Sequence, residues 1–231
     1  MRILLLITAA VAWLTACGGD HPPEFTEAAP EAAEAALLTE QDLSPAWREE
    51  SAGALDDVDL AERCDVLTPD GAFPSAVATA SSPAFGTADQ RSAQSFAAVY
   101  ESEEDASGAV SDLDARVQDC RDDFLAEVKR LAETEIEATG LNLGPFADID
   151  VSIEQEALDS TGDQANIYHV EVTVSVFGTD RQFNADITLV RNGQVISVLV
   201  YSAYGPVKTP EGEALLALLL GRLSAANEKL S

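Results

Sequence analysis

The chain has 231 residues, with 41 Asp or Glu against 13 Lys or Arg, and its formal net charge is -28. A chain of this length forms one large domain or at most two small ones. The charge argues against a nucleic-acid partner and against electrostatic docking on anionic lipid, because both need clustered Lys and Arg. With two His and three Cys, a zinc cage or a Cys–His nucleophile pair has little to draw on. We expect no metal and no cofactor.

The N-terminus predicts an export signal. Arg2 precedes an apolar run over residues 3–14, which is too short for an ordinary membrane-spanning helix and typical of a secretory signal peptide. Leu14-Thr15-Ala16-Cys17 resembles a bacterial lipobox, which implies cleavage after residue 16 and a lipid on the Cys17 thiol. The alternative is a simple secretory signal in which Cys17 is incidental. We expect a lipid-anchored protein on the extracytoplasmic face of the cell membrane.

The next segment, residues 17–36, predicts a flexible tether, since Pro22, Pro23 and Pro30 interrupt regular structure. A short helix over residues 31–38 is the alternative. We place the folded domain at residues 37–231. Residues 39–42 (Thr-Glu-Gln-Asp) approximate a capping box that opens a short helix.

Two cysteines remain once Cys17 is lipidated. In an exported protein, Cys64 and Cys120 are most simply a disulfide, although two buried free thiols are the alternative. Residues 65–92 are rich in Pro, Gly, Ser, Thr and Ala, and we expect a long irregular loop there, either a plain surface loop or a functional one.

The rest of the chain predicts an α+β fold. Apolar side chains recur at helical spacing over residues 102–131 and again from Pro210 to Leu223, where helices are expected. Alternating residues predict strands at 94–100, 149–153, 168–176, 183–189 and 195–201. Asn192-Gly193 predicts a type I′ hairpin turn. We expect an antiparallel meander of about four to six strands packed by two or three helices.

Catalytic motifs are absent from the sequence. It contains no Gly-x-Ser-x-Gly elbow, no phosphate-binding loop, no dinucleotide fingerprint and no His-Glu-x-x-His. A Ser-His-Asp triad would have to use His169, which we expect to be an exposed residue on the polar face of a strand. We expect no catalytic residues and do not expect an enzyme.

The order of these features resembles a known family. Residues 37–43 read Leu-Leu-Thr-Glu-Gln-Asp-Leu and precede Trp47, and a late hairpin, residues 190–193, reads Val-Arg-Asn-Gly. This pattern resembles the PknH-like extracellular sensor domains of actinobacteria, which occur on transmembrane Ser/Thr kinases or as free-standing lipoproteins. The resemblance covers residues 37–231 and implies a sheet packed by helices with a cleft for an unidentified ligand. The kinase sensor has two disulfides, whereas here only Cys64 and Cys120 are available.

Three functions are compatible with these features. The favoured one is a sensor or ligand-binding module for a small molecule, lipid or cell-wall component, with a pocket between helices and sheet. Aromatic side chains suit the walls of such a pocket, and the candidates are Trp47, Phe96, Tyr168, Tyr201 and Tyr204. The second is an envelope protein–protein interaction module, and the third an envelope hydrolase.

Overall fold

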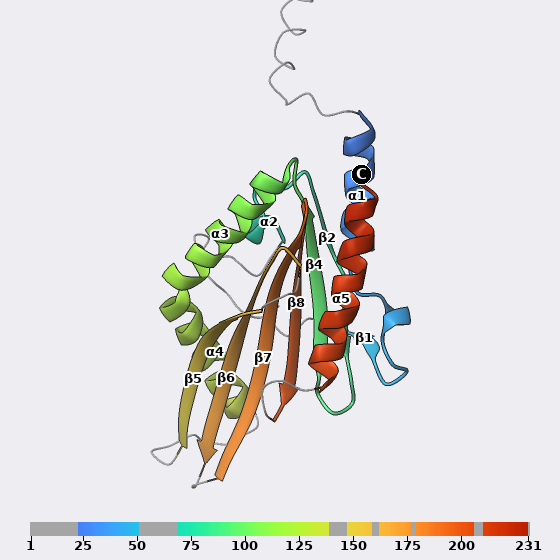
Figure 1. Ribbon diagram of the computed structural model, residues 1–231. Coiled ribbons are helices and arrows are strands. Elements are labelled where there is room, and N and C mark those ends of the chain that lie inside the picture. Colours follow the sequence, from blue (N-terminus) through green and yellow to red (C-terminus); the bar gives the residue numbers. More distant parts are fainter. Residues whose placement is uncertain are drawn as a thin grey trace, which may run out of the picture.

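The computed structural model describes residues 23–50, 69–138, 147–158, 162–176, 179–205 and 210–230. An eight-stranded antiparallel sheet forms the centre of these residues, and helices cover both of its faces (Figure 1). The predicted α+β class is confirmed. The described sheet has more strands than the four to six expected, because three short strands that the sequence did not predict extend one of its edges.

Four long strands form the predicted meander. They are β5 (Ala147–Ala157), β6 (Gln164–Val176), β7 (Thr179–Asn192) and β8 (Val195–Tyr204). Alternate side chains of these strands are apolar, which fits opposite faces of one sheet. Asn192 pairs with Val195, so Gly193 and Gln194 are the two central residues of the β7–β8 turn, and of these only Gly193 has a positive φ, +58°. A positive φ at the first central residue alone is the type II′ pattern, so the predicted type I′ turn was wrong.

The other edge of the sheet lies where a long loop was expected. Strands β2 (Ala78–Ser81) and β3 (Ala84–Gly86) both pair with β4 (Ser92–Val99), and β1 (Arg48–Glu50) pairs with β3. Residues 65–92 therefore contribute two strands and the short helix α2 (Pro69–Ala72), while residues 65–68 lie outside the described part. The strands were missed because small Ala, Ser and Thr side chains show no apolar alternation.

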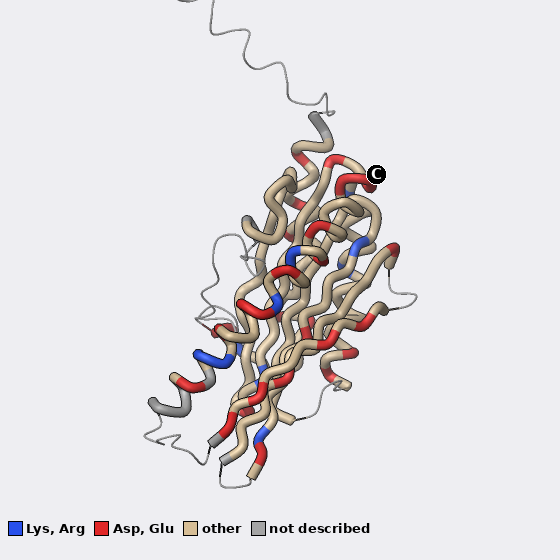
Figure 2. The backbone as a smooth tube through the Cα atoms, turned by 90° about the vertical axis from the view of Figure 1, so that its left-hand side faces the viewer, with Lys and Arg blue, Asp and Glu red and all other residues tan. Residues whose placement is uncertain are grey.

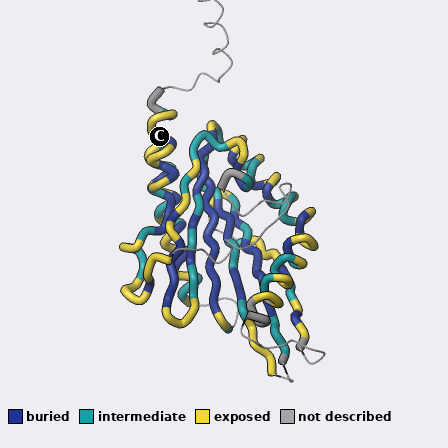
Figure 3. The backbone as a smooth tube through the Cα atoms, turned by 180° about the vertical axis from the view of Figure 1, so that it is seen from behind, coloured by how far each residue is buried: buried dark blue, intermediate teal, exposed yellow. Residues whose placement is uncertain are grey.

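Helices cover the two faces of the sheet from different parts of the chain. Their bounds are α1 (Pro23–Ala35), α3 (Glu103–Asp119), α4 (Arg121–Ala138) and α5 (Pro210–Glu228). Helices α1 and α5 pack together and against β4 and β8, whereas α3 packs against the other face of β7 and β8 and α4 packs against β5 (Figure 1). Seen from behind, buried positions run along the central strands and exposed ones lie on the helices and strand ends (Figure 3).

The single helix expected over residues 102–131 is two helices. Ser102 caps α3 by accepting a hydrogen bond from the Asp105 amide (3.1 Å). The backbone leaves the α-helical region at Cys120, with φ −97° and ψ 4°, and α4 begins at the next residue. The apolar spacing continues across this break, which is why the sequence alone predicted one helix.

Helix α1 corrects the predicted tether. Four alanines at positions 29, 32, 33 and 36 are fully buried and pack with residues of β4 and α5. Their spacing of three and four residues places them on one helix face, and their small side chains allow the helix to approach its neighbours closely. Pro30 lies on the exposed side. The folded domain therefore begins before residue 37, and residues 17–22 of the predicted tether lie outside the described part.

The 3₁₀ turn η1 (Glu40–Asp42) is attached to α5 by the Asp42 carboxylate. This group accepts hydrogen bonds from Arg222 Nη2 (2.8 Å), the Thr39 amide (2.7 Å) and the Thr39 hydroxyl (2.9 Å). Burial acts to raise the pKa of Asp42, but the hydrogen bonds from Arg222 and Thr39 outweigh it, so the pKa lies below its ordinary value.

This pKa shift predicts a pH-dependent stability. A carboxylate with a lowered folded-state pKa stabilises the fold above its unfolded pKa of about 3.9, and the effect is lost as the pH falls through the folded pKa. We expect Asp42→Asn to lower the free energy of unfolding by about 1–2 kcal/mol at neutral pH. Urea unfolding should show this difference shrinking as the pH falls below the unfolded pKa of about 3.9, and a difference that stays constant with pH would contradict the assignment.

Candidate ligand-binding site

Two adjoining cavities lie between the α3–α4 junction and the sheet. The inner one has a volume of about 40 Å³ and the outer one about 160 Å³. Their shared walls are formed by Val117, Arg121, Ile153 and Tyr168. The break between α3 and α4 at Cys120 positions this site, because it turns the two helices over different parts of the same sheet face.

The inner cavity is predominantly apolar. It is lined by Leu113, Val117, Cys120, Arg121, Phe124, Ile153, Tyr168, Ile187, Leu189 and Val198. Leu113 comes from α3 and Phe124 from α4, and both are buried. Removing an apolar ligand group from water against such walls gains about 25 cal/mol per Å². This cavity therefore favours a hydrocarbon group.

The outer cavity is bordered by a polar network centred on Asp114 of α3. Its Oδ1 accepts hydrogen bonds from the Tyr168 hydroxyl, from Gln155 Nε2 (2.8 Å) and from Asn166 Nδ2 (3.3 Å). Gln155 in turn accepts a hydrogen bond from Gln118 Nε2 (2.7 Å). Burial, followed by the hydrogen bond to Asp114 and its charge, raises the pKa of Tyr168 well above its ordinary value, so the phenol stays neutral and acts as a donor.

Arg121 brings a positive charge to both cavities. Its Nη2 donates to the Ile153 carbonyl (2.9 Å), which holds the first residue of α4 against β5. A guanidinium has five N–H donors, so this bond leaves others for a ligand or for water. The polar walls of the outer cavity are thus the Arg121 guanidinium and the Gln118 and Gln155 amides, while Asp114 holds Gln155 and Tyr168 by hydrogen bonds without lining the cavity itself.

The five predicted aromatic residues do not form one site. Of the five, only Tyr168 lines the cavities. Phe96 lies on the same face of the sheet but packs against the core residues beneath α3. Trp47 and Tyr201 are buried on the opposite face, beneath α5. Tyr204 is 55% exposed, and its ring meets that of Phe183 edge-on at 5.6 Å.

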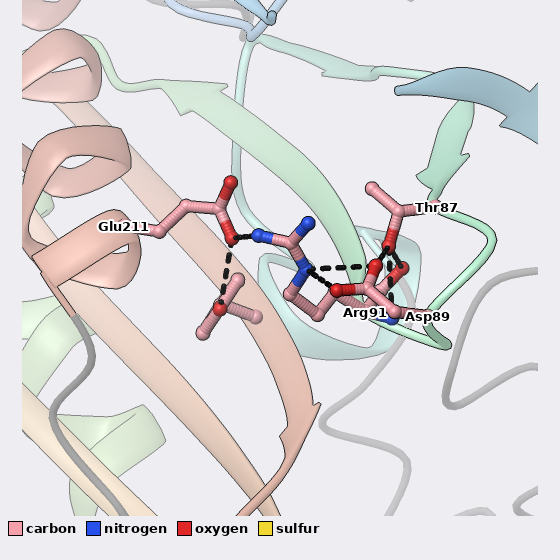
Figure 4. Close-up of polar contacts among 5 residues, drawn as sticks. Thr87, Asp89, Arg91 and Glu211 are labelled. Atoms are coloured by element: carbon pink, nitrogen blue, oxygen red, sulfur yellow. Dashed lines mark hydrogen bonds and ion pairs between the residues drawn. The ribbon is translucent and has the colours of Figure 1, made fainter. Parts of the chain in front are cut away.

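Trp47 and Tyr201 instead belong to a network that holds the first turn of α5. Glu211 accepts hydrogen bonds from Arg91 and from the Tyr201 hydroxyl (3.3 Å) (Figure 4). Arg91 also lies 5.7 Å from the centre of the Trp47 ring and pairs with Asp89 (3.0 Å). These contacts join α5 to the β3–β4 hairpin, so we assign the network a structural role. Trp47 and Tyr201, expected as pocket walls, are therefore core residues that do not line the cavities.

One of the cysteines can be placed. Cys120 is disulfide-bonded and lines the inner cavity. Cys64 and Cys17 lie outside the described residues, so the pairing of Cys64 with Cys120 and the lipid on Cys17 stay predictions. A covalent bond at Cys120 fixes the α3–α4 junction directly beside the candidate site.

The surroundings of two polar residues were missed from the sequence: Asp114 beside the cavities and His169 on the opposite face of the sheet. Asp114 has no sequence signal that separates it from the other acids of α3, yet its carboxylate accepts a hydrogen bond from Tyr168 of β6. His169 was expected to be exposed, but only 8% of its surface is accessible, and its Nδ1 lies 2.7 Å from Asp186 Oδ1. Pairing between a helix and a strand so far apart in sequence leaves no local pattern.

The described residues define an α+β domain with one antiparallel sheet, helices on both faces and a cavity under α3 and α4. No protein-family model and no curated protein matches the sequence. Among solved structures, the chain is similar to the extracellular domain of PknH from Mycobacterium tuberculosis, with a TM-score of 0.42 and 9% identity over 87% of this chain and 97% of that chain. A similarity of this size assigns no family, so the resemblance noted over residues 37–231 stays a prediction.

None of the helices in the described part of the chain combines the length and apolar character needed to span a bilayer.

Proposed function

We propose that this chain is a lipid-anchored extracytoplasmic protein that binds a small amphipathic molecule in the cavities beneath α3 and α4. The observation that carries the proposal is the change from apolar walls in the inner cavity to polar walls in the outer one. An apolar inner cavity adjoins an outer one whose walls include Gln118, Gln155 and Arg121. Ligand pockets typically combine apolar walls with a few polar groups that fix orientation.

The size of the site limits the ligand. Pockets for drug-sized molecules have volumes of about 300–1,000 Å³, whereas the two cavities have about 40 and 160 Å³. We therefore infer a small ligand, with an apolar group of a few carbon atoms against Phe124 and a hydrogen-bonding group near Arg121. We propose binding without catalysis.

The anchor determines how the domain meets the membrane. With Cys17 lipidated, five residues (18–22) separate the lipidated residue from the start of α1 at Pro23, and the six steps from residue 17 to residue 23 span at most about 20 Å. The N-terminal end of α1 lies beside the C-terminal end of α5 (Figure 1). We infer that this end of the domain faces the bilayer.

A binding module is favoured over a docking module by the described surface. Its exposed large hydrophobic side chains are Tyr204 on β8 and Leu218 on α5. Two such residues on separate elements give little of the contiguous apolar area on which protein partners usually dock.

Filling the cavities should abolish binding. Val117 lines both cavities, so Val117→Phe is expected to remove their free volume while keeping an apolar side chain. Native mass spectrometry of protein purified from its own envelope should show a bound non-protein mass on the wild type and its loss from the variant. Leu218→Phe, on the exposed side of α5, is the matched control and should keep the mass.

The same experiment can contradict the proposal. An intact bound mass on folded Val117→Phe would show that the ligand lies elsewhere, and absence of any mass on the wild type would remove the main support. A circular dichroism melt checks that the variant folds. If Val117→Phe does not fold, Ile153→Phe repeats the test, because Ile153 also lines both cavities.

A further inference from the structure

His169 lies in a polar environment on the face of the sheet opposite the ligand cavities. It stands in the middle of β6, with Glu154 of β5 and Asp186 of β7 directly across from it. Its side chain is only 9% exposed. Burying an imidazole costs free energy unless both ring nitrogens find partners, so the surroundings of each nitrogen are informative.

The two ring nitrogens of His169 have different surroundings. Nδ1 lies 2.7 Å from Asp186 Oδ1, and since an ionised carboxylate only accepts hydrogen bonds, Nδ1 carries the proton. In the neutral ring Nε2 then presents a lone pair. This Nε2 is buried and makes no hydrogen bond. The nearest carboxylate oxygen is Glu156 Oε2, at 3.5 Å, and the Glu156 side chain is 46% exposed.

This arrangement matches one half of a zinc site. Zinc binds a His nitrogen and a carboxylate oxygen at about 2.0–2.2 Å each, and in tetrahedral geometry two such ligands are about 3.4 Å apart. The distance from Nε2 to Glu156 Oε2 is 3.5 Å. A carboxylate that accepts from the other ring nitrogen is the usual outer-shell partner of a metal-binding His, and Asp186 holds that position.

We propose that His169 Nε2 and Glu156 bind a divalent transition-metal ion of the zinc type, with Asp186 orienting the imidazole. The described residues contain no group of three or more His, Cys, Asp or Glu side chains arranged around one ion. The site therefore supplies two protein ligands, and water completes the coordination. Such a site takes up metal from solution reversibly and does not act as a structural zinc cage.

The electrostatics of the molecule favour a cation at this position. The whole chain carries a net charge of -28, and acidic positions are spread over strands and helices while basic ones are few (Figure 2). Glu154 and Glu171 lie on the same face of the sheet as His169. Their negative potential concentrates cations near Nε2. Asn184 on β7, opposite Glu171, also has a buried Oδ1 without a hydrogen-bond partner.

The two histidines of the chain provide a matched test, because His21 precedes α1 and His169 lies in the sheet. Long-range ¹H–¹⁵N NMR of the imidazoles, with the full mature chain and zinc alone as the probe, should show Nε2 of His169 shifting on zinc addition while Nδ1 stays protonated. His21→Gln should keep this response and His169→Gln should lose it. Asp186→Asn should weaken zinc binding about 10–100-fold, and Glu156→Gln, which removes one of the two protein ligands, should weaken it at least as much.

Two outcomes would overturn the metal site. One is an unchanged His169 spectrum at millimolar zinc. The other is a ring with both nitrogens protonated at neutral pH, which would identify a purely structural ion pair of His169 with Asp186 and Glu156. Because the ligand cavities lie on the opposite face of the sheet, neither outcome affects the proposed small-molecule binding, and a failure of that binding leaves the zinc test intact.

Discussion

Replacing Cys17 by Ser is expected to move the protein from the membrane fraction to the soluble fraction. The thiol at this position is the predicted site of lipid attachment, and each acyl CH₂ buried in the bilayer contributes about 0.8 kcal/mol. The strongly negative charge repels anionic head groups, so the lipid must supply the whole affinity.

Cell fractionation followed by intact mass measurement tests this prediction. The wild type should carry a diacylglyceryl group on Cys17 after loss of residues 1–16, and the Ser variant should carry none. Thr15→Ser keeps a small residue at that position of the lipobox and serves as the control that should remain membrane-bound. A Cys17→Ser protein that stays in the membrane fraction would contradict the lipid anchor.

Replacing both Cys64 and Cys120 by Ser is expected to give the largest loss of stability. Their predicted disulfide closes a loop of about 57 residues, for which chain entropy gives roughly 4 kcal/mol. In a domain of this size such a loss lowers the melting temperature by about 8–16 °C. Cys120 also fixes the junction of α3 and α4, so the double variant should lose ligand affinity as well.

Calorimetry of the oxidised wild type, the reduced wild type and the double variant measures this effect. Reduction should shift the wild type to the melting temperature of the variant and leave the variant unchanged. Cys17→Ser alone should not alter the melt. An equal melting temperature for the double variant and the oxidised wild type would show that Cys64 and Cys120 are not a stabilising pair.

The strands with strong apolar alternation were predictable. In β6 and β7, the alternating Val, Ile and Leu side chains that predicted the strands lie in one antiparallel pair. Likewise, α5 was predicted from the spacing of its leucines, of which Leu215, Leu219 and Leu223 are buried. These elements carry their burial pattern in their own sequence, so no knowledge of their partners was needed.

Elements that bury small side chains were not predictable. Helix α1 contributes alanines to the core, and alanine gives only a weak signal of burial. The tether was therefore predicted from the three prolines of this segment. Strands β2 and β3 pair with opposite ends of β4, and Pro83 lies between them. Their place in the sheet depends on pairing with a distant strand, and no local pattern indicates it.

The candidate site was predictable only in outline. A pocket between helices and sheet was expected, and two cavities are found there, but four of the five proposed aromatics lie outside them. Aromatic side chains are large and apolar, so they fill the core on both faces. The polar group at the centre, Asp114, could not be distinguished from the neighbouring acids of α3, because its strand partners are more than 40 residues away.

The most direct test of the binding site is a crystal structure of the protein isolated from its own membrane in mild detergent. The proposal predicts non-protein electron density in the cavities, with an apolar end near Phe124 and a polar end within hydrogen-bond distance of Arg121 or Asp114. Density for a bound molecule at another place, or cavities closed by their own side chains with no bound molecule, would contradict it.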